Sequence, residues 1–216
     1  MLGDEVFIHP GLINSIFFAI LLSIFAIIVN KKLKNAKIED KPKGLLNVVE
    51  VIVSTINNLT ISTMGANKAY FAPYIGTLAF YLVVANLSGL LGFVPPTSDY
   101  NVTLGLALIT FVMVQFFGLK SKGVKGYIKG FFEPFPFMFA INVVGELANP
   151  VSMSFRLFGN ILSGVIIMGL LYDALGVFII VLGPVFHSYF DLFAGLVQTF
   201  IFMMLTMVFV SMGMED

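Results

Sequence analysis

Long hydrophobic runs separated by short polar segments dominate the chain. Hydrophobic residues fill five runs, at about 11–30, 72–93, 102–119, 137–173 and 175–212. Each run reaches the roughly 20 residues that a helix needs to cross about 30 Å of hydrocarbon. The pattern therefore predicts an all-α integral membrane protein with about five transmembrane helices.

The last two runs are longer than an upright span requires. A helix over 137–173 would be about 55 Å long at 1.5 Å per residue, nearly twice the hydrocarbon thickness. Such a run must break into two helices or tilt steeply. Apart from Arg156, neither charges nor turn residues break up the later part of either run. We therefore predict two strongly tilted helices joined as a hairpin between Asp173 and Gly176. Both runs contain a proline that we expect to kink its helix rather than end it: Pro150 and Pro184.

The segment 44–63 differs from the five runs because polar side chains interrupt its aliphatic residues. Glu50, Asn57 and Asn58 lie among its valines, isoleucines and leucines. This mixture is typical of an amphipathic helix that lies in the plane of the membrane interface. We predict such a helix at the cytoplasmic surface, within a single membrane domain that covers residues 1–216.

Lysine positions predict the orientation of the chain. Residues 31–43 hold six of the eleven lysines, and four more lie at positions 120, 122, 125 and 129. Basic loops stay on the cytoplasmic side of a membrane. The loop around 95–99 has no basic residue and is expected outside. Five spans then place the N-terminus outside and the C-terminus in the cytoplasm, in a multi-pass protein of a bacterial-type cell membrane.

Composition narrows the chemistry. Hydrophobic residues make up 58% of the chain and charged residues 11%. The lack of cysteine excludes disulfides and thiolate metal sites, and the presence of only two histidines argues against a zinc site. The sequence contains neither a Gly-x-x-x-x-Gly-Lys-Ser/Thr phosphate loop nor a His-Glu-x-x-His motif. We expect no cofactor, no resident metal and no enzyme activity from this chain alone. The lysine-rich segments are explained by orientation and do not indicate nucleic acid.

Arg156 is the only arginine, and apolar sequence flanks it on both sides. A guanidinium at the centre of a bilayer costs roughly 3 to over 10 kcal/mol, so it persists only beside a partner, another charge or water. Arginine also keeps its proton at any physiological pH. A permanent positive charge inside a membrane is well suited to blocking or switching an ion path. The alternative is an arginine that snorkels to the interface from a helix end.

A polar stripe accompanies Arg156 on the fourth predicted span. Ser152, Arg156 and Asn160 follow one another at intervals of four residues, and Asn149 and Ser163 fall close to the same face. Serines and asparagines often pack helices together in membranes. Ser152, Ser163 and Asn149 therefore fit a structural role at least as well as a role in ion transport.

A second polar stripe lies on the fifth predicted span. At 100° per residue, His187, Asp191 and Gln198 spread over about 40° of arc. A carboxylate inside a span needs a partner or water, which makes Asp191 a candidate ion-path residue. His187 is one helical turn away from Asp191, so the pair could also serve only to hold the helix.

Several of these residues lie in longer motifs. Ser152-x-x-x-Arg156-Leu-Phe-Gly-Asn160 is followed about forty residues later by a segment that begins Gln198-Thr-Phe-Ile-Phe. Two further motifs are Pro96-Thr-Ser-Asp99-Tyr-Asn101 and Glu146-Leu-Ala-Asn-Pro150. With these motifs in order, the chain resembles subunit a of the rotary, F-type ATP synthase membrane sector over nearly its whole length.

The resemblance implies a stator ion-channel subunit. In that family the arginine, here Arg156, faces the ion-binding carboxylates of a rotating c-ring. The glutamine, here Gln198, lies nearby on the next helix, and two offset aqueous half-channels bring ions from opposite sides. The other residues that the resemblance and the polar stripes indicate for the ion path are Asp191, Asn160, Ser152, Asn86, Asp99, His187 and Glu146. Implied partners are the oligomeric c-ring, b-type peripheral stalk subunits and other ATP synthase subunits.

The sequence departs from the family pattern at two positions. Many proton-driven members carry an acid three positions after the asparagine that matches Asn86, and a glutamate or histidine nine positions after the arginine. This chain has Gly89 and Val165 there, while Asp191 is present seven residues before Gln198. The smaller set of titratable groups is compatible with protons or with Na⁺ bound in transit. The alternative function is a small secondary ion transporter, although no inverted repeat is visible.

Overall fold

The computed structural model of the chain describes residues 10–34 and 44–214. The regular elements in these ranges are all helical, which confirms the predicted all-α class. The α-helices are α1 (Pro10–Lys34), α2 (Leu45–Met64), α3 (Ala72–Leu87), α4 (Tyr100–Phe131), α5 (Met138–Leu175), α6 (Ile179–His187) and α7 (Ala194–Met214). Short 3₁₀ turns are η1 (Ala66–Phe71), η2 (Ser88–Leu91), η3 (Pro96–Ser98) and η4 (Gly176–Phe178), and η5 (Ser188–Phe193) is a π-helix.

Five helical stretches in the described residues are long and apolar enough to cross a membrane. They are Pro10–Lys34, Leu45–Met64, Ala66–Leu91, Tyr100–Phe131 and the continuous run Met138–Met214. The number agrees with the sequence prediction, but the membership differs, because α2 is included and the last two predicted spans form one run. The helical state of 44–63 is confirmed, whereas its position at the cytoplasmic surface stays a prediction.

The second basic segment is helical rather than a loop. α4 begins at Tyr100, after the carboxylate of Asp99 accepts a hydrogen bond of 2.9 Å from the backbone N–H of Asn101. The helix runs to Phe131 and turns at Gly123, whose φ of 68° is one that side chains with a β carbon disfavour. The lysines expected in a loop therefore lie on two helical pieces, one on each side of that bend. Lysine-rich sequence alone does not end a helix, since lysine is a good helix former.

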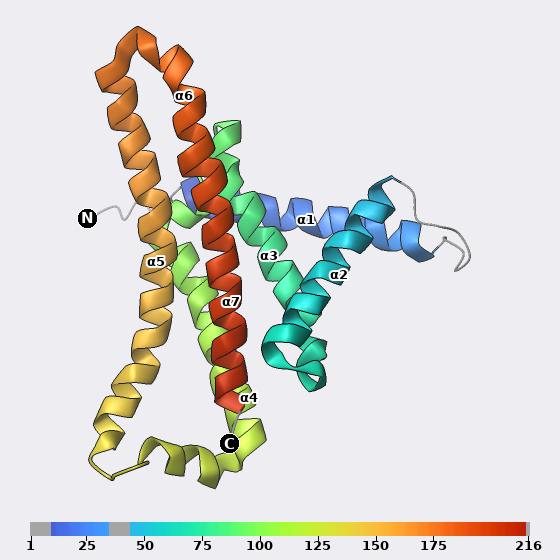
Figure 1. The fold of residues 1–216 in the computed structure, drawn as a ribbon, viewed down its shortest axis with the longest axis vertical. Coiled ribbons are helices and arrows are strands. Elements are labelled where there is room, and N and C mark those ends of the chain that lie inside the picture. Colours follow the sequence, from blue (N-terminus) through green and yellow to red (C-terminus); the bar gives the residue numbers. More distant parts are fainter. Residues whose placement is uncertain (1–9, 35–43, 215–216) are drawn as a thin grey trace, which may run out of the picture.

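The predicted hairpin of long helices is confirmed. α5 passes through Pro150 without ending, and the chain reverses at Gly176, whose φ is 50°. α6, η5 and α7 then run back beside α5, so that the two arms lie side by side in Figure 1. α5 has 38 residues, which at 1.5 Å per residue is about 57 Å. α1 crosses the direction of both arms at a large angle (Figure 1). α1 and the arms therefore cannot all stand upright in one bilayer, and the steep tilt of the hairpin stays a prediction of the sequence.

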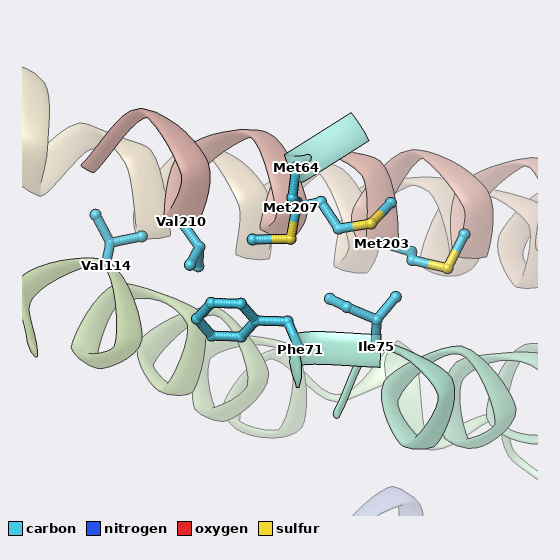
Figure 2. Packing of buried hydrophobic residues seen from close by; sticks show 7 residues of the cluster. All are labelled: Met64, Phe71, Ile75, Val114, Met203, Met207 and Val210. Atoms are coloured by element: carbon cyan, nitrogen blue, oxygen red, sulfur yellow. The ribbon is translucent and has the colours of Figure 1, made fainter. Parts of the chain in front are cut away.

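The core lies where α7 meets α3 and α4. One buried cluster consists of Met64, Phe71, Ile75, Val114, Met203, Met207 and Val210 (Figure 2). A second cluster joins α5 to the same helices through Leu78, Leu82, Ala107, Met153, Leu157 and Phe202. Membrane helices have little hydrophobic drive to associate, so close packing of such surfaces holds them together. The core therefore fixes the position of α5 and α7 relative to each other.

Some predictions fall on residues that the structure does not describe. These are the placement of the N-terminus outside, the part of the first basic segment at 35–43, and the delivery of Glu215 and Asp216 to the cytoplasm. They stay predictions of the sequence.

Candidate functional site

α5 carries Arg156 on the face turned away from the core. The buried side chains of this helix include Met153, Leu157 and Ile161, spaced four residues apart. Arg156 lies between them in sequence and is exposed. Among the residues that the structure describes, no hydrogen bond or ion pair reaches its guanidinium. In a membrane this charge needs a polar partner from outside the chain, because bare hydrocarbon disfavours it by several kcal/mol.

Two polar neighbours of Arg156 share its exposure. Ser152 and Ser163 are exposed, and Asn149 and Asn160 are half-buried. The Ser163 hydroxyl donates to the backbone carbonyl of Asn160 at 2.9 Å. The outward polar face of α5 thus contains Ser152, Arg156 and Ser163, with the two asparagines at its edges. An outward polar face on a membrane helix indicates a protein or water interface rather than lipid.

Gln198 lies on the inner side of α7. Its side chain is 5% exposed, and its amide nitrogen Nε2 has no hydrogen-bond partner among the described residues. A buried unpaired donor costs roughly 1–3 kcal/mol. Buried polar groups without a partner are exceptional in proteins. One explanation is a hydrogen-bond acceptor that binds Gln198 from outside the chain.

Asn86 ties α3 to α7. Its amide nitrogen donates to the Gly195 carbonyl at 3.1 Å and to the Thr199 hydroxyl at 3.0 Å, while its amide oxygen accepts from the Thr97 hydroxyl at 2.8 Å. A β carbon at Gly195 would lie 3.2 Å from the Asn86 β carbon, so glycine there permits the close approach. Asn86, predicted as an ion-path residue, is engaged here in positioning the helix that carries Gln198.

A hydrogen-bonded chain of three side chains links the two arms near their turn. The Tyr172 hydroxyl on α5 lies 2.8 Å from Nε2 of His187, and Nδ1 of His187 lies 2.5 Å from a carboxylate oxygen of Asp191. The three side chains are partly exposed. Each of them can donate or accept a proton, so the chain connects the outer surface of α5 to Asp191.

The π-helix η5 holds Asp191 and changes the predicted stripe. Ser188–Phe193 lies between His187 and Gln198, so the arc expected for an uninterrupted α-helix does not apply across it. Gln198 is buried, whereas His187 and Asp191 are partly exposed. The predicted stripe is therefore divided: His187 and Asp191 are partly exposed together, and Gln198 is buried apart from them. π-helical turns are frequent at functional sites.

Glu146 belongs to a second polar group at the far end of the hairpin. The Tyr127 hydroxyl donates to the side-chain oxygen of Gln115, and the Gln115 amide nitrogen donates to the Glu146 carboxylate at 3.1 Å. A cavity of about 660 Å³ adjoins this group, and its walls include Lys122, Tyr127, Glu146 and Asn149. The cavity is large enough for many water molecules, each of which takes about 30 Å³ in the liquid.

Arg156 lies between these two polar groups along α5. Ten residues separate it from Glu146 and sixteen from Tyr172, which correspond to about 15 Å and about 24 Å at 1.5 Å per residue. The cavity lies on one side of Arg156, and the Tyr172, His187 and Asp191 chain lies on the other. Two polar regions thus lie on opposite sides of the permanent charge of Arg156 along the hairpin.

Sequence reasoning missed Tyr172, Gln115 and Tyr127. Polar side chains next to predicted turns were the available signal, but their partners lie on other helices and no sequence spacing reveals them. Asp99 was predicted for the ion path, and the structure gives it a capping role on α4. In the described part of the chain, no group of three histidine, cysteine, aspartate or glutamate residues is placed to hold a metal ion.

Comparison with known proteins gives a consistent match. The family described as ATP synthase A chain matches residues 12–211. ATP synthase subunit a, sodium ion specific, from Propionigenium modestum is 39% identical over 183 residues, which cover 77% of this chain and 62% of that relative. ATP synthase subunit a from Trichlorobacter lovleyi is 35% identical over 202 residues, covering 91% of this chain and 84% of the relative. The corresponding protein from Geotalea daltonii is 36% identical over 201 residues, with coverage of 91% and 83%.

Proposed function

The chain belongs to the ATP synthase A chain family, and we propose that it forms the stator part of the ion path, facing a rotating ring of c subunits. It is a multi-pass membrane protein that works with other ATP synthase subunits and translocates ions rather than catalysing a reaction by itself. The family match does not favour the alternative of a small secondary transporter. Further proposed partners are b-type peripheral stalk subunits.

The exposed position of Arg156 carries this proposal. Its guanidinium points out of the fold from the middle of an apolar helix and has no described partner within the chain. A ring of carboxylates on another subunit would supply the missing opposite charge. A carboxylate that arrives loaded with a cation meets a guanidinium that competes for it, so the cation is released.

The two polar groups on either side of Arg156 fit two separate half-channels. The cavity beside Glu146 adjoins Lys122, and by the lysine rule it opens to the cytoplasm. The Tyr172, His187 and Asp191 chain then belongs to the outer path, and Gln198 offers its unpaired amide near the centre. Arg156 repels cations that would pass directly between the two paths. Each elementary charge that crosses contributes about 2.3 kcal/mol per 100 mV.

The coupling ion in this proposal is H⁺ or Na⁺. One relative carries sodium specificity in its name, and the carboxylate and amide oxygens of the polar groups are ligands that hard cations accept. The Tyr172 hydroxyl and the His187 imidazole, which are hydrogen-bonded in series to Asp191, equally suit a proton relay. ATP synthesis by the reconstituted complex, measured under a sodium gradient and under a proton gradient, identifies the coupling ion. Only the gradient of that ion should support synthesis.

A cross-linking experiment tests the interface itself. The chain lacks cysteine, so single cysteines can be placed at Ser152, which is exposed beside Arg156, and at Ser154, which is fully buried. With a cysteine near the carboxylate of subunit c, Ser152→Cys should form a disulfide with the ring, and Ser154→Cys should not. Equal yields at both positions, or none at Ser152, would contradict the proposed interface.

A further inference from the structure

Among the described residues, the side-chain hydrogen bonds that join α1 to the rest of the fold lie near its beginning. Asn14 donates to the Val94 carbonyl at 2.8 Å, and the Ser15 hydroxyl lies 2.7 Å from the Tyr81 hydroxyl. The rings of Phe17 and Phe18 contact Phe93. Farther along α1, Val29 is the only residue buried among those described. The second half of the helix therefore stands apart from α3.

A cavity of about 600 Å³ fills the space between them. Its two main walls are α1 and α3, with α2 and α4 closing the sides. Small side chains face it from α1 and α3, including Ala19, Ser23, Ala26, Gly76 and Thr77. Narrow side chains on facing helices normally permit close contact, so the open space between these walls is a feature of the fold that calls for an occupant.

Three polar side chains in the walls of this cavity are hydrogen-bonded within the fold: Ser23, Thr77 and Tyr81, whose hydroxyl lies 2.7 Å from the Ser15 hydroxyl. The Ser23 hydroxyl donates to the Ala19 carbonyl at 2.8 Å, and the Thr77 hydroxyl donates to the Pro73 carbonyl at 2.9 Å. Both hydroxyl hydrogens are thus used within their own helices. The remaining surface is almost entirely aliphatic and aromatic, so an apolar occupant fits and a polar one would lose its hydrogen bonds with water.

The cavity has the size of a site for a small ligand, since its volume of about 600 Å³ lies within the roughly 300–1,000 Å³ of such sites. A single flexible hydrocarbon chain matches this shape, because it is narrow and can bend between α1 and α3.

Positive charge gathers at one end of the cavity. Asn30 and Leu33 line that end on α1, and Lys31, Lys32 and Lys34 lie in the same turn. All three lysines are exposed. Among the described residues around the cavity, Glu50 is the acid that adjoins a lining residue, Val49 on α2, so the three lysines outnumber it. Basic residues beside a pocket between membrane helices are suited to an anionic lipid headgroup.

We propose that this cavity binds one anionic glycerophospholipid, with an acyl chain between α1 and α3 and its phosphate at the lysines of the last α1 turn. The lipid fills the gap between the second half of α1 and α3. It holds the second half of α1 at a fixed distance from α3. This site is separate from the ion path, since none of its lining residues belongs to the polar groups around Arg156.

Photolabelling of the intact complex tests the proposal. The complex is reconstituted in phosphatidylcholine vesicles that contain either phosphatidylglycerol or phosphatidylcholine with a diazirine on the acyl chain. Phosphatidylglycerol should label the lining residues of α1 and α3 several-fold more than phosphatidylcholine does. Ala26→Phe should suppress this labelling by filling the cavity, whereas Ile27→Phe, on the outward face of α1, should not. Replacing the three lysines by glutamine should remove the preference for phosphatidylglycerol while phosphatidylcholine labelling persists.

Two outcomes would overturn the lipid site. Equal labelling of lining residues and of outward residues such as Ile27 would indicate only the general lipid annulus. Cross-linking of an Ala26→Cys variant to a helix of another ATP synthase subunit would assign the space to that helix. ATP synthesis by each variant complex verifies its assembly, because none of these substitutions touches the ion path.

Discussion

The carboxyl carbon of Asp191 lies 3.6 Å from the place that a β carbon would occupy at Gly89. Gly89 follows α3, and Asp191 lies on the π-helix between α6 and α7, so two distant segments meet at one carboxylate. A β carbon at position 89 would lie at ordinary van der Waals distances from its neighbours, and the backbone there has no positive φ. A side chain at position 89 can therefore be accommodated and would reach the same space as Asp191.

The first prediction moves the charge between these two positions. Asp191→Asn should slow ion uptake from the outer side roughly 10-fold or more, because the amide keeps the volume but removes the cation-attracting charge. Adding Gly89→Asp should restore part of the rate, since it returns a carboxylate to the same place. ATP synthesis under a limiting ion gradient measures both.

Gly89→Asn in the Asp191→Asn background is the matched control and should restore nothing. Amounts of assembled complex must be compared, because Asp191 also holds His187. If Asp191→Asn lowers the amount of complex and leaves the rate per complex unchanged, Asp191 acts only in helix packing. Full rate in a fully assembled Asp191→Asn complex would refute its role in the ion path.

The second prediction concerns the permanent charge. Arg156→Ala should reduce coupled ATP synthesis to background while the membrane sector leaks ions, since no fixed charge then separates the two paths. Arg156→Lys should also fail, because lysine lacks the planar fork that pairs with a carboxylate. Ser163→Ala, on the same face and one turn from Asn160, serves as the control and should keep most of the activity. Normal synthesis by the Arg156→Ala complex would exclude the assignment.

The hydrophobic pattern was sufficient to predict the long apolar helices and the hairpin, but not the helical state of the second basic segment. Runs of apolar residues longer than a bilayer can only form long, inclined or broken helices, so α5 and the turn at Gly176 follow from length and composition. The bend at Gly123 was not predictable, because a glycine within helix-forming residues either bends the helix or continues it. The π-helix at Ser188–Phe193 has no periodic signature in sequence, and it split the stripe of His187, Asp191 and Gln198.

The site was predictable where its residues share one helix. Ser152, Arg156 and Asn160 lie at helical spacing, and the structure keeps them on one outward side. Contacts between helices were not predictable, such as Tyr172 with His187 or Gln115 with Glu146. These pairs depend on how α5 packs against α6 and against α4, which no local pattern encodes.

The third prediction concerns the polar group at the cavity beside Glu146, which we propose opens to the cytoplasm. Glu146→Gln should slow ion exchange on that side several-fold, because it removes the only carboxylate in the chain of hydrogen bonds from Tyr127 through Gln115. ATP-driven pumping into inverted vesicles measures uptake from the cytoplasmic side. Tyr127→Phe should have a smaller effect in the same direction, since it frees Gln115 but keeps the charge. Unchanged pumping by both variants would separate this cavity from the ion path.

The fourth prediction concerns the hydrogen bonds of Asn86. Asn86→Leu keeps a similar volume but leaves the partners at Thr97 and Gly195 without this side chain, which should cost roughly 2–5 kcal/mol of stability. The expected result is a lower midpoint of thermal aggregation and less assembled complex. Asn58→Leu, on the exposed side of α2, is the control and should change little. Equal midpoints for the two variants would show that the Asn86 network contributes no net stability.

The fifth prediction concerns orientation. The lysine distribution places the α4 bend in the cytoplasm and the loop after α3 outside. Two exposed positions report on these sites: Lys125, on the basic piece of α4, and Leu91, which is 74% exposed in η2. Since the chain lacks cysteine, Lys125→Cys and Leu91→Cys introduce single labelling sites. A membrane-impermeant maleimide should label Lys125→Cys only in inverted vesicles and Leu91→Cys only in intact cells. Labelling of both positions from one side would contradict the orientation. The opposite pattern would reverse the assignment of the two half-channels, because Asp191 lies beside Gly89 in the segment that carries Leu91.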